Sequence, residues 1–424
     1  MAATDTHRAI EAVFRIEQAK LIAVLTRMVR DVGLAEELAQ DALVAALEQW
    51  PGGGIPDNPG AWLTAAAKHR AIDRFRRNNL AERKHDALSY ELELQQDAPP
   101  DLDAALDDAI GDDLLRLVFT ACHPVLSTEA HAALTLRLIG GLTTEEIARA
   151  FLVPEPTIAQ RIVRAKRTLA EKRVPFEVPH GEDIAARLSS VLSVIYLIFN
   201  EGYAATAGDD WMRPSLCDEA LRLGRILAGL AREEPEVHGL VALMEIQASR
   251  FHARTSPSGE PVLLLDQNRA RWDQLLIRRG LAALARAEAQ GRALRRAPGP
   301  YVLQASIAAC HARAARPEDT DWARIVGLYG ALAEVTPSPI VELNRAVALA
   351  MLFGPAAGLA IVDALGSEPA LKTYHLLPSV RGDLLSKLGR TEEARDEFER
   401  AASLTRNARE RDLLLRRAAD CGGA

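Results

Sequence analysis

The segment 142–169, LTTEEIARAFLVPEPTIAQRIVRAKRTL, carries polar side chains at a spacing suited to hydrogen bonding with nucleic acid. At 100° per residue, its apolar side chains fall on one helical face and its glutamine, threonine and arginine side chains on another. The polar face comprises Thr157, Gln160, Arg161, Arg164 and Arg167. A helix with such a face suits the major groove of DNA. The alternative is an amphipathic surface helix whose basic face is only solvated.

The residues before this face predict how it is positioned. Thr143 and Glu146 have the spacing of a capping box at the start of a first short helix. The run 152–154 ends that helix, and Glu155 and Pro156 open the second, where an acid suits the helix dipole and a proline loses no hydrogen bond. The segment therefore predicts a helix-turn-helix.

A second basic element lies in the helix predicted over 59–83, PGAWLTAAAKHRAIDRFRRNNLAER. Arg70, Arg74 and Arg77 share one stripe of this helix, and we expect Ala65, Ile72 and Phe75 on the opposite, apolar face. Single-stranded nucleic acid needs cations and flat side chains on which bases stack. Trp62 suits such stacking, or it is a core residue at the start of the helix.

The segment before that helix, AEELAQDALVAALEQW at 35–50, predicts an amphipathic helix with an acidic face. Leu38, Ala42 and Ala45 suit a core face. The expected outer face comprises Glu36, Glu37, Gln40 and Asp41.

Composition indicates an all-α fold. Alanine, leucine, arginine and glutamate dominate the 424 residues, and no run alternates in the manner of a strand. We expect a cytoplasmic chain, because the N-terminus lacks a signal peptide and no 18-residue segment is free of charge and apolar. The four cysteines form no CxxC pair, which suits a reducing compartment.

The net charge of −7 is unusual for a DNA-binding protein. The segment 91–113 contains nine acids and no lysine or arginine, and the two basic elements flank it. An acidic protein binds free DNA weakly, because non-specific affinity comes mostly from neutralising phosphates. Either another protein supplies the affinity or the basic segments are only solvated.

Breaks in the helical pattern predict the domain organisation. We expect a first domain over 7–90, an acidic linker over 91–111, a helix-turn-helix domain over 112–175 and a helical extension over 180–424. Within the extension, the segment 374–404 places small and aromatic residues as a tetratricopeptide repeat does, and 337–365 is a weaker relative. A non-repetitive helical bundle is the alternative.

Catalytic and metal motifs are absent from the sequence. It contains no P-loop, no GxGxxG after a strand and no HExxH. The pair Cys122–His123 has no second pair at ligand spacing, and His311 beside Cys310 suits packing better than nucleophilic catalysis. We therefore expect no enzyme activity, no catalytic residue, no cofactor and no metal.

Together these elements resemble the extracytoplasmic-function (ECF) class of sigma factors in the sigma-70 family. An acidic-polar helix, a tryptophan-led basic helix, an acidic linker and a helix-turn-helix follow one another over residues 7–172. The run 122–153 and the segments YLIFNEGY, DQNRARWD and YVLQASIAACHARA further resemble the subgroup with a long C-terminal extension of tetratricopeptide-like repeats. The resemblance implies two small helical sigma domains followed by a larger helical repeat domain.

The resemblance also implies partners for the residues above. Core RNA polymerase would bind Glu36, Glu37, Gln40 and Asp41. The −10 promoter element would bind Trp62, Lys68, Arg70, Arg74, Arg76 and Arg77. The −35 element would bind Thr157, Gln160, Arg161, Arg164 and Arg167. In this family the recognition helix often starts Gly-Thr-Val-Lys-Ser, whereas here the residues are Pro156-Thr157-Ile158-Ala159-Gln160.

The expected function is therefore that of a sigma factor. Its partner, core RNA polymerase, would supply most of the affinity for DNA. We expect its C-terminal domain to regulate it, with a protein or small-molecule regulator binding to the repeats and no membrane partner. The alternative is a polymerase-independent helix-turn-helix regulator with a repeat sensor domain. That alternative gives no reason for the basic helix at 59–83 beside the acidic one.

Overall fold

The structure is a computed structural model that describes residues 2–83, 113–151, 153–179, 183–204, 207–208, 212–257 and 260–422. The acidic linker expected at 91–111 lies outside these residues. The chain divides into two compact units, Met1–Val194 and Ile195–Ala424. The division falls inside helix α8 (Asp183–Tyr203), after the boundary expected at 175–180.

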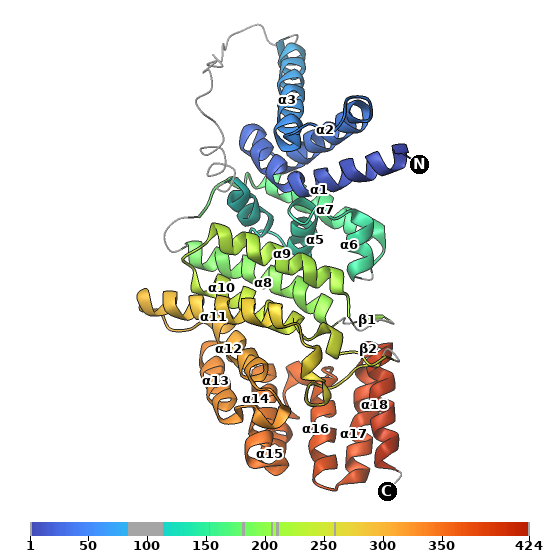
Figure 1. Cartoon of the computed structure of the whole chain (residues 1–424), viewed down its shortest axis with the longest axis vertical. Helices are drawn as coiled ribbons and strands as arrows, with labels where there is room; N and C mark the ends of the chain where they lie inside the picture. Colours follow the sequence, from blue (N-terminus) through green and yellow to red (C-terminus); the bar gives the residue numbers. More distant parts are fainter. Residues whose placement is uncertain are drawn as a thin grey trace. The chain divides into compact units, whose positions relative to one another are not determined.

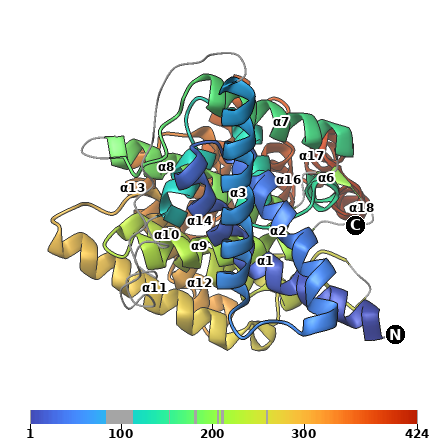
Figure 2. The same ribbon diagram turned by 90° about the horizontal axis from the view of Figure 1, so that it is seen from above.

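The first unit begins with three helices, α1 (Ala2–Val29), α2 (Val32–Gly53) and α3 (Pro59–Arg83), which pack on one another (Figure 2). Helices α2 and α3 agree with the helices predicted at 35–50 and 59–83. Asp31 caps α2 by accepting a hydrogen bond from the Leu34 N–H at 2.8 Å.

The face that α3 buries differs from the expected one. Leu63, Ala67 and Ala71 are buried, whereas Ala65 is exposed and Ile72 is half-buried. Alanines occur all around this helix, so the apolar pattern in the sequence does not define one face. The burial is decided by packing on α1 and α2.

The rest of the first unit is a second helical cluster. It contains helical residues 113–121, α5 (Thr128–Leu138), α6 (Thr144–Phe151) and α7 (Glu155–Glu171). The expected capping box is present at α6: the Thr143 N–H donates to Glu146 Oε2 at 2.8 Å, and the Glu146 N–H donates to Thr143 Oγ1 at 3.1 Å. The predicted helix-turn-helix is confirmed, because α6 and α7 pack against each other across the break at 153–154.

The first turns of α8 also belong to this unit. The Arg187 guanidinium donates to the Phe119 carbonyl oxygen at 2.9 Å and lies 5.7 Å from the centroid of the Phe119 ring. The Ser190 hydroxyl donates to the Cys122 carbonyl oxygen at 3.2 Å. Residues beyond the helix-turn-helix therefore help to hold this cluster together.

The second unit is helical almost throughout. Its helices after α8 are α9 (Pro214–Leu230), α10 (Pro235–Ala248), α11 (Gln274–Ala293), α12 (Pro300–Arg313), α13 (Trp322–Val335), α14 (Pro339–Phe353), α15 (Pro355–Leu365), α16 (Leu376–Lys387), α17 (Thr391–Leu404) and α18 (Ala408–Cys421). Helix α10 packs on α9, α11 and α12, and from α12 onward each helix packs on its neighbours in the chain (Figure 1).

Short elements complete the second unit. Short 3-10 turns lie between helices: η1 (Phe251–Ala253), η2 (Leu264–Asp266), η3 (Arg269–Arg271), η4 (Pro317–Asp319) and η5 (Pro369–Leu371). Two strands of two residues, β1 (Ala207–Gly208) and β2 (Arg406–Asn407), pair in parallel. The all-α expectation is confirmed, apart from this short strand pair and an isolated β-bridge between Thr255 and Pro261. Among the described residues, no helix combines the length and apolar character needed to cross a bilayer.

The hairpin of α16 and α17 packs around a glycine. Phe398 is 1% exposed, and its ring lies so close to Gly382 that a Cβ there would be 2.9 Å from Cε1. Gly389, between the two helices, has φ of 76°, a backbone conformation that side chains disfavour. These positions are the small and aromatic ones singled out in the sequence, although close packing alone does not define the class of repeat.

Candidate nucleic-acid interface

Helix α7 separates its apolar and polar side chains as the sequence predicted. Its buried residues are Ile158, Ile162, Ala165 and Leu169. On the other face, Gln160, Arg164 and Arg167 are exposed, and Thr157 and Arg161 are half-buried. The apolar stripe packs on α5 and α6 and leaves the glutamine and arginine side chains to solvent.

The arginines of this face have few partners on the protein. Arg167 Nε donates to Glu171 Oε1 at 2.6 Å, an exposed pair one turn along the helix. Exposed pairs of this kind are weak in water, so this one leaves the guanidinium free to exchange partners. Arg161 lies near Glu129, whose pKa is lowered by its own backbone N–H, by the Ser127 hydroxyl and, less strongly, by that arginine.

The basic face of α3 lies directly against the acidic face of α2. The Arg74 guanidinium donates to Glu37 Oε2 at 3.0 Å, and both side chains are largely exposed. The Arg70 guanidinium donates to the Asp41 carbonyl oxygen and lies 3.8 Å from the Asp41 carboxylate. Two sets of residues expected to bind different partners are thus paired with each other. These two contacts are called the α2–α3 ion pairs below.

The remaining residues expected at the −10 element are placed as follows. Lys68 is exposed on α3. Trp62 is half-buried and packs edge to face on the buried Trp50, with ring centroids 5.2 Å apart. Part of the Trp62 indole is therefore a packing surface. The α3 backbone runs through Arg76 and Arg77, whose side chains lie outside the described part of the molecule.

Glu36 does not lie on the outer face of α2, and this corrects the sequence expectation. Its side chain is buried, with only 4% of the residue exposed. Arg137 Nε of α5 lies 2.6 Å from Glu36 Oε1, and Lys166 of α7 pairs with the other carboxylate oxygen. Gln40 is half-buried, and Glu37 and Asp41 are exposed. The helical pattern of the sequence places Glu36, Glu37, Gln40 and Asp41 on one face of α2. It does not reveal that α5 and α7 cover the part of this face that carries Glu36.

Arg137 and Lys166 are functional candidates that the sequence reasoning missed. Their side chains are 22% and 23% exposed. The signal in the sequence is weak, because a cation at the edge of an apolar helical stripe is usually solvated, and Lys166 lies beside Arg167 in a basic run. Only the contact between α2 and α7 identifies their common partner.

The Cys122 thiol is buried inside the second helical cluster. Burial raises the pKa of its thiol to about 11, against smaller opposite effects of the Thr135 hydroxyl and Arg187. A thiol must lose its proton to bind a metal. Among the residues that the structure describes, no group of three or more His, Cys, Asp or Glu side chains could hold a metal ion.

The family comparisons agree with this division of the first unit. The model for sigma-70 region 2 matches residues 13–80, which include α2 and α3, and the model for sigma-70 region 4 matches residues 116–169, which include α5 to α7. A family of unknown function, DUF6596, matches residues 187–288. The fold and its two basic helices thus define a chain with sigma-70 region 2 and region 4 domains and a helical C-terminal region. The sigma-70 family is not enzymatic.

Full-length relatives extend this result. The uncharacterized protein R00370 of Rhizobium meliloti (strain 1021) is 45% identical over 392 residues, which cover 92% of this chain and 90% of that protein. The chain belongs to the same family as that protein. A probable ECF RNA polymerase sigma factor, SigI of Mycobacterium tuberculosis, is 28% identical over 173 residues, covering 41% of this chain and 58% of its own length.

A third relative, the ECF RNA polymerase sigma factor SigK of Mycobacterium sp. (strain KMS), is 29% identical over 161 residues, covering 36% of this chain and 77% of its own length. The similarity to both named sigma factors thus covers less than half of this chain. No solved structure matches the chain.

Proposed function

We propose that this protein is a sigma factor that directs bacterial RNA polymerase to specific promoters. The observation that carries the proposal is the pair of solvent-facing basic helices, α3 and α7, one within the region 2 match and one within the region 4 match. In this proposal α3 binds the −10 element and α7 reads the −35 element. The net charge of −7 fits, because polymerase then supplies most of the affinity for DNA.

The polymerase contact is proposed for the exposed part of the α2 face. Glu37, Gln40 and Asp41 would meet a basic surface of the polymerase, and opposite charges of this kind steer association. Glu36 is given a different role, because its carboxylate is buried between Arg137 and Lys166. We assign it to holding α2 against α5 and α7.

Reconstitution tests the proposal. Purified protein is mixed with core polymerase for a pull-down and for promoter-dependent run-off transcription, and with duplex DNA alone for a gel shift. We expect association and initiation with polymerase and weak binding to DNA without it. Tight binding to duplex DNA without polymerase, and no pull-down, would instead favour a conventional helix-turn-helix regulator.

Removing a guanidinium from α7 is expected to weaken promoter recognition specifically. Arg164→Ala and Arg161→Ala should each reduce run-off transcription roughly tenfold or more, since one good base contact contributes about 1–3 kcal/mol. Pull-down of core polymerase by these two variants should stay unchanged. Arg286 is an exposed arginine on α11, and the control Arg286→Ala should change neither run-off transcription nor pull-down. Loss of polymerase binding in the α7 variants would contradict this division of labour.

We further propose that the helical extension regulates the sigma domains, with tetratricopeptide-like hairpins as its binding surfaces. The support is its length, which exceeds that of the sigma domains, and the packing of consecutive helices from α12 to α18. A truncation after Val194 tests this, because it keeps the Arg187 and Ser190 contacts that a truncation after 175 would remove. Equal transcription by the truncated and full chains would exclude regulation by the extension.

A further inference from the structure

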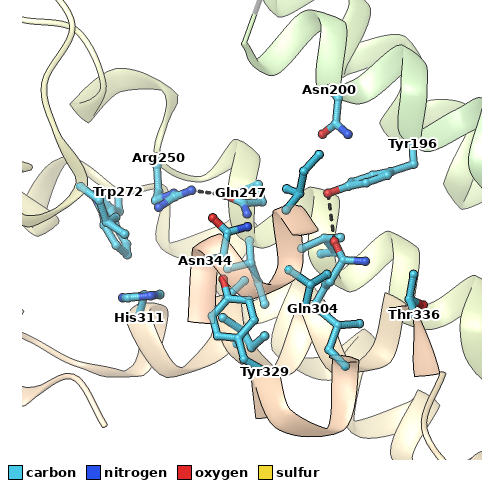
Figure 3. A pocket seen from close by; sticks show the side chains of 18 of the residues that line it. Tyr196, Asn200, Gln247, Arg250, Trp272, Gln304, His311, Tyr329, Thr336 and Asn344 are labelled. Carbon is cyan, nitrogen blue, oxygen red and sulfur yellow. Dashed lines mark hydrogen bonds between the residues drawn. The ribbon is translucent and has the colours of Figure 1, made fainter. Parts of the chain in front are cut away.

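A cavity of about 580 Å³ lies in the unit Ile195–Ala424, and Figure 3 shows the side chains around it. The three segments of the extension that stand out in the sequence each contribute to its walls. YLIFNEGY contributes Tyr196 and Asn200, DQNRARWD contributes Trp272, and YVLQASIAACHARA contributes Gln304 and His311. Three segments far apart in the chain thus meet at one cavity, whose volume suits a small organic molecule.

The walls combine aromatic rings with carboxamides. Four side-chain amides line the cavity: Asn200, Gln247, Gln304 and Asn344. The Tyr196 hydroxyl donates to Gln304 Oε1 at 3.1 Å, which fixes that amide (Figure 3). Apolar surface with a few fixed polar groups is the usual lining of a small-molecule site.

Arg250 gives the cavity its charge. Its guanidinium donates to Gln247 Oε1 and to the Tyr203 hydroxyl, which are neutral, and it lies 5.8 Å from the centroid of the Trp272 ring. Among the described residues that line the cavity, none is an aspartate or glutamate. The nearby Arg269 likewise donates to carbonyl oxygens, those of His311 at 2.9 Å and Ala314 at 2.7 Å.

His311 adds no charge to this wall near neutral pH. Burial, and then the positive charges of Arg250 and Arg269, lower the pKa of its imidazole to about 4. Among the described residues of the lining, Arg250 therefore provides the one charge, and it is positive. A partly desolvated guanidinium with only neutral partners gains a charge-assisted hydrogen bond when an oxyanion reaches it.

From this arrangement we infer that the cavity binds a small organic oxyanion, with a carboxylate or phosphate head group at Arg250 and a body between the aromatic rings and carboxamides. The walls form within the extension alone, so this inference does not depend on sigma activity. A binding experiment tests it even if the extension has no effect on transcription.

Calorimetry on the full chain tests the inference with matched probes. The oxyanions are phenylacetate, indole-3-acetate, octanoate and phenyl phosphate; their neutral counterparts are phenylacetamide, indole-3-acetamide, octanamide and phenol. We expect at least one oxyanion to bind with one-to-one stoichiometry and at least tenfold more tightly than its neutral counterpart. Comparing the carboxylates with phenyl phosphate identifies the head group. Absence of binding by all four oxyanions at millimolar concentration, or equal binding of charged and neutral probes, would overturn the inference.

Variants of the cavity show whether the binding occurs there. Arg250→Gln should weaken the oxyanion roughly tenfold or more, because a hydrogen bond to a charged group contributes about 1.5–3 kcal/mol. Arg286→Gln, on the exposed side of α11, should bind as the unchanged protein does. If circular dichroism shows that Arg250→Gln is unfolded, two other variants replace it in the binding experiment: Arg250→Lys and Ala308→Met, which fills the cavity. Both should weaken binding of the oxyanion. Unchanged affinity in the folded variants would refute the site.

Discussion

Glu36→Gln is expected to destabilise the first unit by about 2–4 kcal/mol, because it leaves two cations facing a neutral amide at a buried site. Arg137 and Lys166 approach the Glu36 carboxylate from two different helices and are only 22% and 23% exposed. The estimate lies below that for a fully buried pair, since both cations retain some contact with water. Denaturant unfolding followed by circular dichroism measures the loss.

The adjacent Glu37 provides a matched control. Its side chain is 63% exposed and pairs with the exposed Arg74, so Glu37→Gln should cost at most about 1 kcal/mol. Equal losses in the two variants would show that the buried carboxylate has no special role in stability.

The Glu36 contact also bears on how α3 and α7, the two helices proposed to bind DNA, are used. Helix α2 contacts both α3 and α7, and its 22 residues span roughly 33 Å. The −10 and −35 elements are named for positions about 25 base pairs apart, which is roughly 85 Å of B-DNA. We expect region 2 and region 4 to separate before both elements are bound. Spin labels on Lys68 and Gln160 should therefore show more long distances in Glu36→Gln than in Glu37→Gln.

Phe398→Ala is expected to cost about 3–5 kcal/mol in the second unit, because it removes a fully buried ring from the α16–α17 hairpin. The ring packs on Gly382, and the Arg417 guanidinium lies 4.4 Å from its centroid. Scanning calorimetry should show the corresponding transition lowered by on the order of 10 °C.

Phe353 is the matched control in the same unit. It is 70% exposed at the end of α14, and Phe353→Ala should change stability by no more than about 0.5 kcal/mol. Similar shifts for both variants would contradict the packing described for the hairpin.

Local signals in the sequence were sufficient for the helices that carry the candidate site. Local signals predicted where α6 and α7 begin: the capping box of Thr143 and Glu146 for α6, and the pair Glu155–Pro156 for α7. These signals act within one turn of a helix, so they can be read without knowledge of the fold. The apolar stripe of α7 was equally clear, because four buried residues recur at helical spacing.

The sequence did not predict contacts between distant elements. Glu36 and Arg137 are 101 residues apart, and nothing in either local pattern indicates the other. The sequence of the alanine-rich α3 likewise does not define which face is buried. Packing on α1 and α2 buries Leu63, Ala67 and Ala71. The cavity in the extension shows the same limit, since its three segments were recognised separately and only the fold brings them together.

The α2–α3 ion pairs have a thermodynamic consequence for the proposed sigma factor. Glu37 and Asp41 act as counterions built into the protein, so Arg70 and Arg74 release fewer salt ions when they bind phosphates, and DNA binding by the free protein depends less steeply on salt. If polymerase engages the same two carboxylates, it frees both arginines. Binding of polymerase and of promoter DNA would then be positively linked, and each would strengthen the other by the same factor.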